Sequence, residues 1–259
     1  MLTIDDILKR LYTIAPFEMA ESYDNVGLLV GDKTARVKRG LICLDITRDV
    51  VDEAKHSGID LIISHHPIIF SPIKSVTKQH TPIVFDLIKH GISAIAMHTN
   101  LDLANGGVND VLFNKLELRD KMPLSLDLES DRESMGLVGR LDEYISPDEF
   151  AHYVKDKLSA NGIRYYPGNR KIKTVAICGG SGGSVLDTAM ELGAHAFVTG
   201  DIKHDLFMKS QNDRFTLIDA GHYATEVHIV YELVKNLNDY FDDYIFKVAG
   251  SGDEKVKYL

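Results

Sequence analysis

Short apolar runs alternate with segments of helical periodicity along most of the chain. Continuous runs of Ile, Leu and Val are typical of strands buried on both faces of a sheet, and the amphipathic segments between them predict covering helices. The predicted strands are residues 27–30, 39–46, 59–64, 92–97, 137–141, 174–178, 195–200, 216–221 and 244–249. The predicted helices are residues 3–15, 47–58, 82–91, 107–116, 146–162, 184–192 and 223–236. This order of elements predicts an α/β fold.

One polar stretch interrupts this rhythm. Residues 119–136 (RDKMPLSLDLESDRESMG) are acidic and have no hydrophobic periodicity, so they predict a boundary between two domains. We therefore expect two interlinked α/β domains with mixed, helix-covered sheets. The first is residues 1–120 plus 222–259, which carries most of the candidate metal ligands, and the second is residues 121–221.

Composition narrows the class of protein. The 259 residues carry a formal net charge of -9, which argues against general nucleic-acid binding, because that needs a basic face. Cys43 and Cys178 each lie in an apolar run and are too far apart in sequence for a thiolate zinc motif. The chain shows neither a signal peptide nor an apolar run long enough to span a membrane. These features predict a cytoplasmic protein.

Candidate ligand side chains gather where the predicted strands end. Ligands of open α/β sheets bind beyond the carboxyl ends of the strands, so these positions are the place to search. Of the eleven histidines, five lie at or near strand ends: His65, His66, His98, His204 and His222. Carboxylates accompany them, with Asp102 following His98, Asp201 preceding His204, and Glu226 four residues after His222.

Imidazole nitrogen and carboxylate oxygen are ligands that first-row divalent metals accept. The metal interpretation is favoured for His65, His66, Asp102, His222 and Glu226, which suit two ions; the metal is Zn, Fe, Mn, Co or Ni. Because His65 and His66 are adjacent, they need an irregular turn to serve one site, and Pro67 is consistent with one. His98 remains open as a ligand, a residue that orients a ligand, or a proton donor.

The other histidines favour an ordinary structural or solvent-exposed role. Five of them lie within or at the ends of helical patterns: His56, His80, His90, His152 and His228. His195 precedes the apolar part of its predicted strand. The Gly-rich segment 178–184 (CGGSGGS) joins a strand to a helix, where its amides could cradle a phosphate, although a plain tight turn fits equally well. In the segment YDNVGLLVGD, Asp24 and Asn25 are suited to hold a substrate or to orient a metal ligand.

An ordered set of motifs resembles one known family. YDNVGLLVGD, DLIISHHPIIF, HTNLDLANGGVND, CGGSGG, TGDIKHD and DAGHYATE follow one another along almost the whole chain. This set resembles the NGG-interacting-factor-three-like family, whose members are often labelled GTP cyclohydrolase 1 type 2 homologs. The resemblance implies two linked α/β domains, a dinuclear centre held by the five ligands above, and a homohexameric ring. The first motif departs from the family's usual Trp by having Tyr23.

The predicted function is that of a metal-dependent hydrolase acting on a nucleotide or related phosphorylated heterocycle. Two ions can activate a water and clamp a phosphate or carbonyl oxygen. His98 and His204 are then candidates for proton transfer, and the substrate contacts are expected from Asp24, Asn25, Gly180, Gly182, Asp201 and Lys203. The alternative is a non-enzymatic protein that binds or delivers metal ions or serves as a scaffold. A DNA-linked regulator fits the family's name but not the acidic charge.

Overall fold

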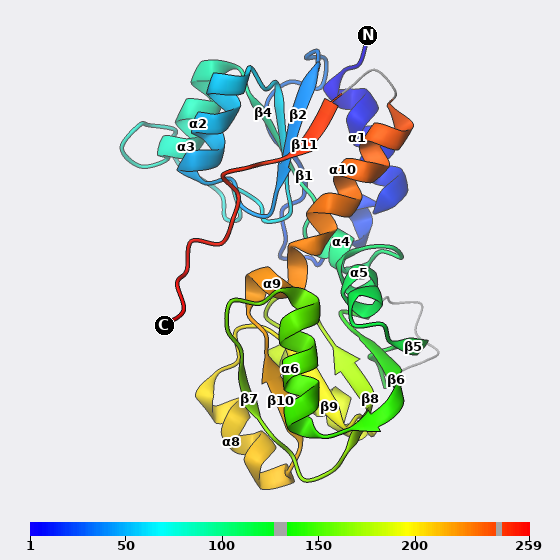
Figure 1. The fold of residues 1–259 in the computed structure, drawn as a ribbon. Coiled ribbons are helices and arrows are strands. Elements are labelled where there is room, and N and C mark those ends of the chain that lie inside the picture. The colour runs from blue at the N-terminus through cyan, green and yellow to red at the C-terminus, as the bar shows by residue number, and fades with distance from the viewer. Residues whose placement is uncertain (127–133, 242–244) are drawn as a thin grey trace. The chain divides into compact units, whose positions relative to one another are not determined.

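The computed structural model describes residues 1–126, 134–241 and 245–259 and divides the chain into two compact units (Figure 1). The first unit comprises Met1–Asn105 and Ile229–Lys255, and the second comprises Gly106–His228 and Val256–Leu259. Each unit is built from two stretches of sequence, so the two are interlinked. The α/β class and the helix-covered mixed sheets that the sequence predicts are confirmed.

The units differ from the predicted domains at their borders. Helix α5 (Val108–Lys115) belongs to the second unit, because its Leu112 and Phe113 are buried in one cluster with Leu141 and Phe150. The predicted boundary, residues 119–136, begins with strand β5 (Arg119–Pro123), and its residues 127–133 lie outside the described residues.

A five-stranded sheet forms the centre of the first unit. Its order is β1-β4-β3-β2-β11; β1 runs antiparallel to β4, and the other pairs are parallel. The strands are β1 (Gly27–Val30), β2 (Arg39–Cys43), β3 (Leu61–Ser64), β4 (Ser93–Ala96) and β11 (Ile245–Val248). All the side chains of β3 and β4 are buried, as expected for strands that are covered on both faces.

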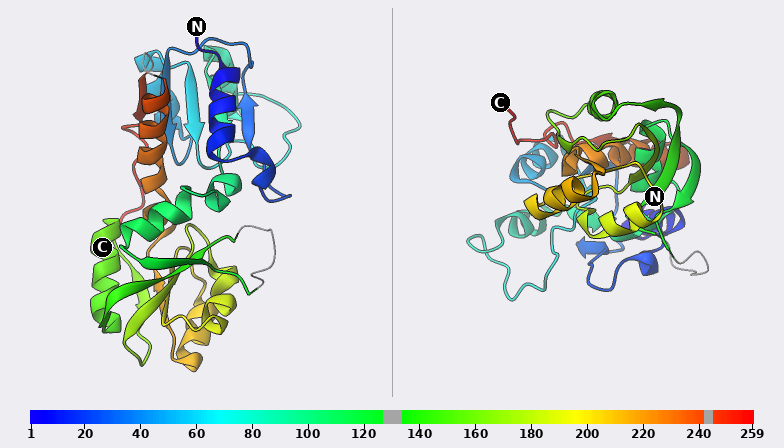
Figure 2. Two further views of the ribbon diagram at one scale, coloured as in Figure 1. Left: turned by 90° about the vertical axis from the view of Figure 1, so that its right-hand side faces the viewer. Right: turned by 90° about the horizontal axis from the view of Figure 1, so that it is seen from below.

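Two pairs of helices cover this sheet. Helices α2 (Arg48–Ser57) and α3 (Pro82–His90) pack on one face, and α1 (Ile4–Ile14) and α10 (His228–Tyr240) lie on the other (Figures 1 and 2). Arg10 of α1 bonds to Asn236 of α10 at 2.7 Å, which ties the second pair together. The unit also contains η1 (Phe17–Met19) and the short α4 (Thr99–Leu103).

A six-stranded sheet forms the centre of the second unit. Its order is β5-β6-β8-β9-β10-β7, with β8, β9 and β10 parallel and the outer pairs antiparallel. The remaining strands are β6 (Leu137–Ile145), β7 (Arg164–Tyr166), β8 (Ile172–Ile177), β9 (Ala196–Thr199) and β10 (Thr216–Asp219). Helices α5 and α6 (Pro147–Leu158) pack on one face, and α7 (Leu186–Glu191) and α8 (His204–Asp213) on the other. The unit also holds η2 (Gly183–Val185) and α9 (His222–Glu226).

Two helices begin with capping boxes. Thr3 accepts the amide of Asp6 while the Asp6 carboxylate accepts the amide of Thr3, and Ser146 with Glu149 repeats this arrangement at α6. Every helix among the described residues is too short or too polar to cross a membrane.

Candidate metal centre

The carboxyl ends of β3 and β4 bring three histidines together in the first unit. His65 and His66 directly follow β3, and His98 follows β4. The ring centroids are 5.0 Å apart for His65 and His66, 5.2 Å for His65 and His98, and 5.6 Å for His66 and His98. One ring nitrogen from each lies within 4.8 Å of the others, so the three side chains could hold a metal ion.

A bend after β3 allows the two adjacent histidines to serve one site. The amide of His65 donates to the Cys43 carbonyl at 3.1 Å, and that of His66 donates to the Leu44 carbonyl at 2.9 Å. The hydroxyl of Ser64 donates to the carbonyl of His66 at 2.8 Å, which fixes the backbone as it leaves the strand. The irregular turn that the sequence requires is therefore present.

Hydrogen bonding fixes which nitrogen of His65 faces the cluster. Its Nδ1 lies 2.7 Å from the carbonyl oxygen of Met97. Because a carbonyl only accepts, Nδ1 carries a proton, so the neutral ring has its lone pair on Nε2. The carboxylate of Asp102, on α4, has Oδ1 3.5 Å from this Nε2. Asp102 is thus placed beside His65.

Carboxylates hold the other two rings in the same way. Nδ1 of His66 lies 2.9 Å from Oδ1 of Asp45, and Nδ1 of His98 lies 2.9 Å from Oδ1 of Asp24. A carboxylate that accepts from Nδ1 leaves Nε2 as the atom available to a metal, which is the arrangement found around histidine ligands in metalloproteins. The donor set of the first unit therefore fits a divalent ion.

Asp24 is a buried carboxylate held entirely by hydrogen bonds. Besides His98, it accepts from the Thr99 amide at 3.0 Å, the Thr99 hydroxyl at 2.6 Å and the Asn25 amide at 2.7 Å. Burial by itself would raise the pKa of Asp24, but the bonds from His98, Thr99 and Asn25 outweigh it and hold that pKa well below its usual range. Asp24 is therefore ionised, and its hydrogen bond holds the ring of His98.

The second unit contributes a separate pair of candidate ligands on α9. His222 begins this helix and Glu226 ends it, so the two side chains share one face, and His222 Nε2 lies 3.1 Å from Glu226 Oε2. Nδ1 of His222 lies 2.7 Å from Oδ2 of Asp201, which follows β9. His222 therefore has the same hydrogen-bonded geometry as the histidines of the first unit.

The Gly-rich loop supports α9 from within the second unit. The amides of Gly179, Gly180 and Gly182 donate to Asn109 Oδ1, Thr225 Oγ1 and Thr199 Oγ1 at 2.9, 3.0 and 2.9 Å. Gly180 and Gly182 were predicted to contact substrate, but their amides already donate hydrogen bonds to side chains of the protein. This engagement favours the plain tight turn over a phosphate cradle.

Two predicted residues stand apart from these groups. Lys203 precedes α8 and His204 begins it, and both side chains are exposed. Among the described residues, neither belongs to a group that could hold a metal ion. Their predicted contacts with substrate remain predictions.

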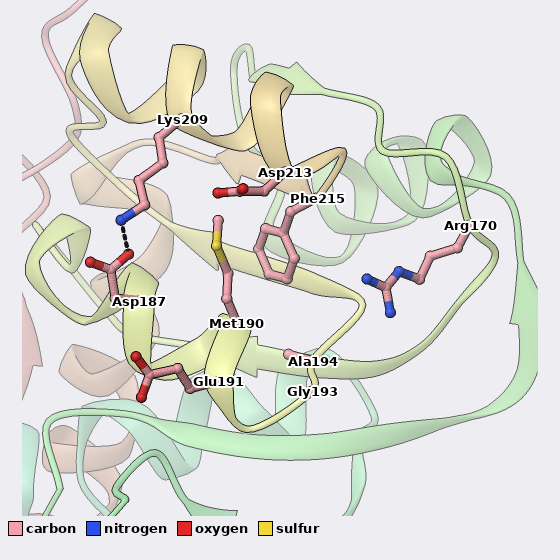
Figure 3. A pocket seen from close by; sticks show the side chains of 9 residues that line it. All are labelled: Arg170, Asp187, Met190, Glu191, Gly193, Ala194, Lys209, Asp213 and Phe215. Atoms are coloured by element: carbon pink, nitrogen blue, oxygen red, sulfur yellow. Dashed lines mark ion pairs between the residues drawn. The ribbon is translucent and has the colours of Figure 1, made fainter.

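A pocket of about 450 Å³ lies elsewhere in the second unit (Figure 3). It is at the amino-terminal end of β10, where Phe215 precedes the strand, whereas His222 lies beyond the carboxyl end. Lys209 of α8 and Asp187 of α7 form an ion pair at one side of it, and Arg170 lies at the other (Figure 3). None of the predicted site residues lines this pocket, so we assign it no part in the metal chemistry.

Asp45 is a candidate site residue that was not predicted from the sequence. This residue lies just beyond β2, which ends at Cys43, whereas the apolar run LICLDI predicts a strand that continues to Ile46. If the predicted strand had ended at Cys43, Asp45 would have been one of the candidate residues that follow a strand.

The chain is similar to known proteins over its whole length. A family model described as Duf34/NIF3 (NGG1p interacting factor 3) matches residues 2–253. A Clostridium perfringens protein named GTP cyclohydrolase 1 type 2 homolog is 31% identical over 267 residues, which cover 100% of each chain. The crystal structure of a Staphylococcus aureus hypothetical protein has a TM-score of 0.90 at 32% identity, covering 99% of each chain. A Bacillus cereus protein related to NIF3 has a TM-score of 0.91 at 22% identity, covering 100% of this chain and 99% of its own, and supports the fold alone.

Proposed function

The chain belongs to the Duf34/NIF3 (NGG1p interacting factor 3) family, and from this membership and its histidine geometry we propose that it is a dinuclear metal-dependent hydrolase. Its substrate in this proposal is a nucleotide or related phosphorylated heterocycle. The proposed ligands are His65, His66, Asp102, His222 and Glu226.

One observation carries the metal assignment. Each of the three proposed histidine ligands has its Nδ1 hydrogen-bonded to an oxygen of the protein: the Met97 carbonyl for His65, Asp45 for His66 and Asp201 for His222. The exposed His56 and His90 also bond through Nδ1, to carbonyl oxygens of their own helices. The bond carries weight here because it fixes rings that lie beside other candidate ligands, as it does for histidine ligands in metalloproteins. Zn, Fe, Mn, Co and Ni all accept this nitrogen and oxygen donor set.

The protein's own groups then have distinct parts in hydrolysis. Bound divalent ions supply Lewis acidity and make water nucleophilic near neutral pH. His98, oriented by Asp24 through Nδ1, presents Nε2 for transfer of a proton to or from the substrate. Asp24 keeps the ring in one tautomer, as a carboxylate does for a general base. In the same proposal, substrate contacts come from Asn25, Asp201 and Lys203, and His204 is a second group for proton transfer.

The cluster of His65, His66 and His98 also favours a second candidate, a protein that binds or delivers metal without catalysis. If His98 is itself a ligand, the first unit offers a three-histidine site and loses its proton-transfer group. Metal content and turnover of His98→Ala test the role of this residue. The hydrolase requires full metal content with loss of turnover, whereas loss of metal would make His98 a ligand.

The decisive experiment combines elemental analysis with a hydrolysis screen of GTP and related nucleotides on the same untagged sample. We expect about two ions per chain and turnover that depends on them. Glu226→Ala is expected to lose one or both ions, whereas Glu232→Ala, an exposed change on α10, keeps both. Full metal in Glu226→Ala would overturn the ligand set, and two ions without turnover would favour metal delivery.

Assembly and location complete the proposal. Family members form hexameric rings, and we propose a cytoplasmic homohexamer here. Light scattering that gives the mass of one chain at working concentration would refute this part of the proposal.

A further inference from the structure

Two exposed aromatic side chains lie beside the histidine cluster of the first unit. Tyr23 is 62% exposed and Phe70 is 48% exposed, and their ring centroids are 6.5 Å apart. Phe70 in turn meets His98 edge to face, with centroids 6.4 Å apart and ring planes at 81°. The three rings form a continuous row that ends at the candidate proton-transfer group.

The segments that carry these rings are fastened together by polar side chains of the same motif. The side-chain Nδ2 of Asn25 donates to the carbonyl of Ile69 at 2.5 Å, which ties the loop of Tyr23 to the residue before Phe70. The Glu21 amide donates to Thr99 Oγ1 at 2.9 Å, and Asp24 binds both His98 and Thr99. The segment 21–25 is therefore attached to the start of α4 on one side and to the loop after β3 on the other.

Such anchoring has a functional consequence. An exposed apolar ring on a mobile loop gains little from a ligand, because binding must first order the loop. Here Tyr23 and Phe70 are already held in place by hydrogen bonds of their neighbours. Exposed aromatic faces that are fixed in this way are the usual means by which proteins bind flat heterocyclic rings, through stacking that tolerates any base.

The planes of the two rings are tilted at 52° to one another, so a flat ligand can meet one ring by its face and the other by its edge. We propose that Tyr23 and Phe70 form an aromatic platform that binds the planar ring of the substrate in this way and presents it to His98. This inference rests on the proposed function and specifies the residues that select the substrate class. It also explains why an aromatic residue at position 23 is compatible with the site even though it is Tyr and not Trp: stacking needs a ring face, and tyrosine supplies one.

Because the chain contains no Trp, the fluorescence of one introduced indole can report on ligand binding. Tyr23→Trp places the protein's one indole on the platform. The probes are guanosine 5′-monophosphate and ribose 5-phosphate, which share the sugar and phosphate and differ in the base. We expect saturable quenching of the indole by guanosine monophosphate and no comparable quenching by ribose 5-phosphate. Absence of quenching by guanosine monophosphate at millimolar concentration would overturn the platform.

Two further variants test the rings themselves by calorimetric titration. Loss of one stacking partner is expected to weaken binding of guanosine monophosphate about tenfold in Tyr23→Leu and in Phe70→Leu. Binding of ribose 5-phosphate is expected to stay as in the unchanged protein. Tyr231→Leu, which removes a 55% exposed tyrosine from α10, is the matched control and is expected to change neither affinity.

Metal content measured on every variant separates this inference from the proposed function. All three leucine variants are expected to keep the metal of the unchanged protein, because none alters a ligand. Equal binding of both probes by metal-loaded protein would refute the platform and leave the metal centre standing. A protein that holds no metal but still prefers guanosine monophosphate would refute the metal centre and support the platform.

Discussion

The carboxylate of Glu226 occupies the space that a side chain at residue 180 would fill. A Cβ built on Gly180 would lie 2.1 Å from Oε1 of Glu226, and the Gly180 backbone has a φ of +61°, a left-handed value that favours glycine. The Gly180 amide also donates to Thr225, the neighbour of Glu226 on α9. The glycine therefore lets the loop after β8 approach the helix that carries two candidate ligands.

Gly180→Ala is expected to displace Glu226 and lower the metal content of the protein. The left-handed backbone adds a cost of about 1 to 2 kcal/mol for any residue with a Cβ. Gly193→Ala is the matched control, because Gly193 has a φ of +74° and no atom within 4 Å of its added Cβ. Elemental analysis and urea unfolding of both variants separate the two effects. A Gly180→Ala protein with full metal content would contradict the role assigned to this glycine.

Asp45 and Asp201 have a shared role that can be tested as a pair. Each accepts a hydrogen bond from Nδ1 of a proposed ligand, His66 and His222 respectively. Replacing the carboxylate with an amide removes the negative charge while keeping the size, and changes of this kind lower metal affinity about 10- to 100-fold. We expect Asp45→Asn and Asp201→Asn each to weaken zinc binding within that range, measured by competition with a chelating dye.

The control for this pair is Asp49→Asn, an exposed carboxylate in the first turn of α2. It carries the same change of charge and is expected to leave zinc affinity unchanged. Equal weakening in all three variants would show that only the net charge matters, and would contradict a positioning role for Asp45 and Asp201.

The elements that the sequence predicted well have strong local signals. Helix α6 has a capping box at Ser146 and buried strands such as β3 are continuous apolar runs, so local chemistry specifies both. Helix α8 was not predicted, because its apolar residues are consecutive in its first half and its N-cap, Lys203, makes no side-chain cap bond. The predicted helix 223–236 is divided into α9 and α10, but Val227 between them keeps helical dihedral angles, which explains the continuous pattern.

The candidate site was predictable to the extent that strand ends mark it. His65, His66 and His98 do lie together, and Asp102 and the His222–Glu226 pair are placed as their spacing implies. The sequence did not show which groups the Asp24 carboxylate bonds to, because its partners His98 and Thr99 are more than 70 residues away along the chain. Long-range hydrogen bonds of this kind depend on strand order, which motifs do not encode.

Asp24→Asn tests the link between this buried carboxylate and His98. An amide can replace only part of the four hydrogen bonds that Asp24 accepts, and leaving one buried donor unsatisfied costs about 1 to 3 kcal/mol. We therefore expect Asp24→Asn to lower the free energy of unfolding by about 1 to 3 kcal/mol at pH 7, as measured by urea unfolding. The pKa of Asp24 is lowered in the folded protein, so this stability is present above the ordinary pKa of an aspartate and is lost only as the pH falls through the lowered value.

A double-mutant cycle with His98→Gln shows how much of this effect passes through the ring. Coupling between Asp24→Asn and His98→Gln is expected, because the two side chains are bonded at 2.9 Å. Effects that simply add would mean that Asp24 serves Thr99 and Asn25 alone, and would remove the basis for its orienting role.

The free energy of unfolding is expected to depend on pH through His195, independently of any metal. It lies just before β9, as the sequence indicated, and its Nδ1 accepts the amides of Lys173 and Thr174 at 3.0 and 3.3 Å. Burial, assisted by Arg170, lowers the pKa of His195. A protonated ring cannot accept at Nδ1, so protonation removes both bonds.

Because the pKa of His195 is lower in the folded chain, the unfolded chain takes up the proton first as the pH falls. The stability that neutral His195 contributes is therefore complete above its ordinary pKa of about 6.5 and is lost as the pH falls through the lowered value. We expect His195→Asn, which keeps an acceptor but does not titrate, to lose less stability than the unchanged protein between pH 8 and pH 5 in urea unfolding. His152→Gln, which removes an exposed histidine from α6, is expected to keep the original pH dependence. An identical pH dependence in His195→Asn and the unchanged protein would rule out His195 as a source of the acid sensitivity.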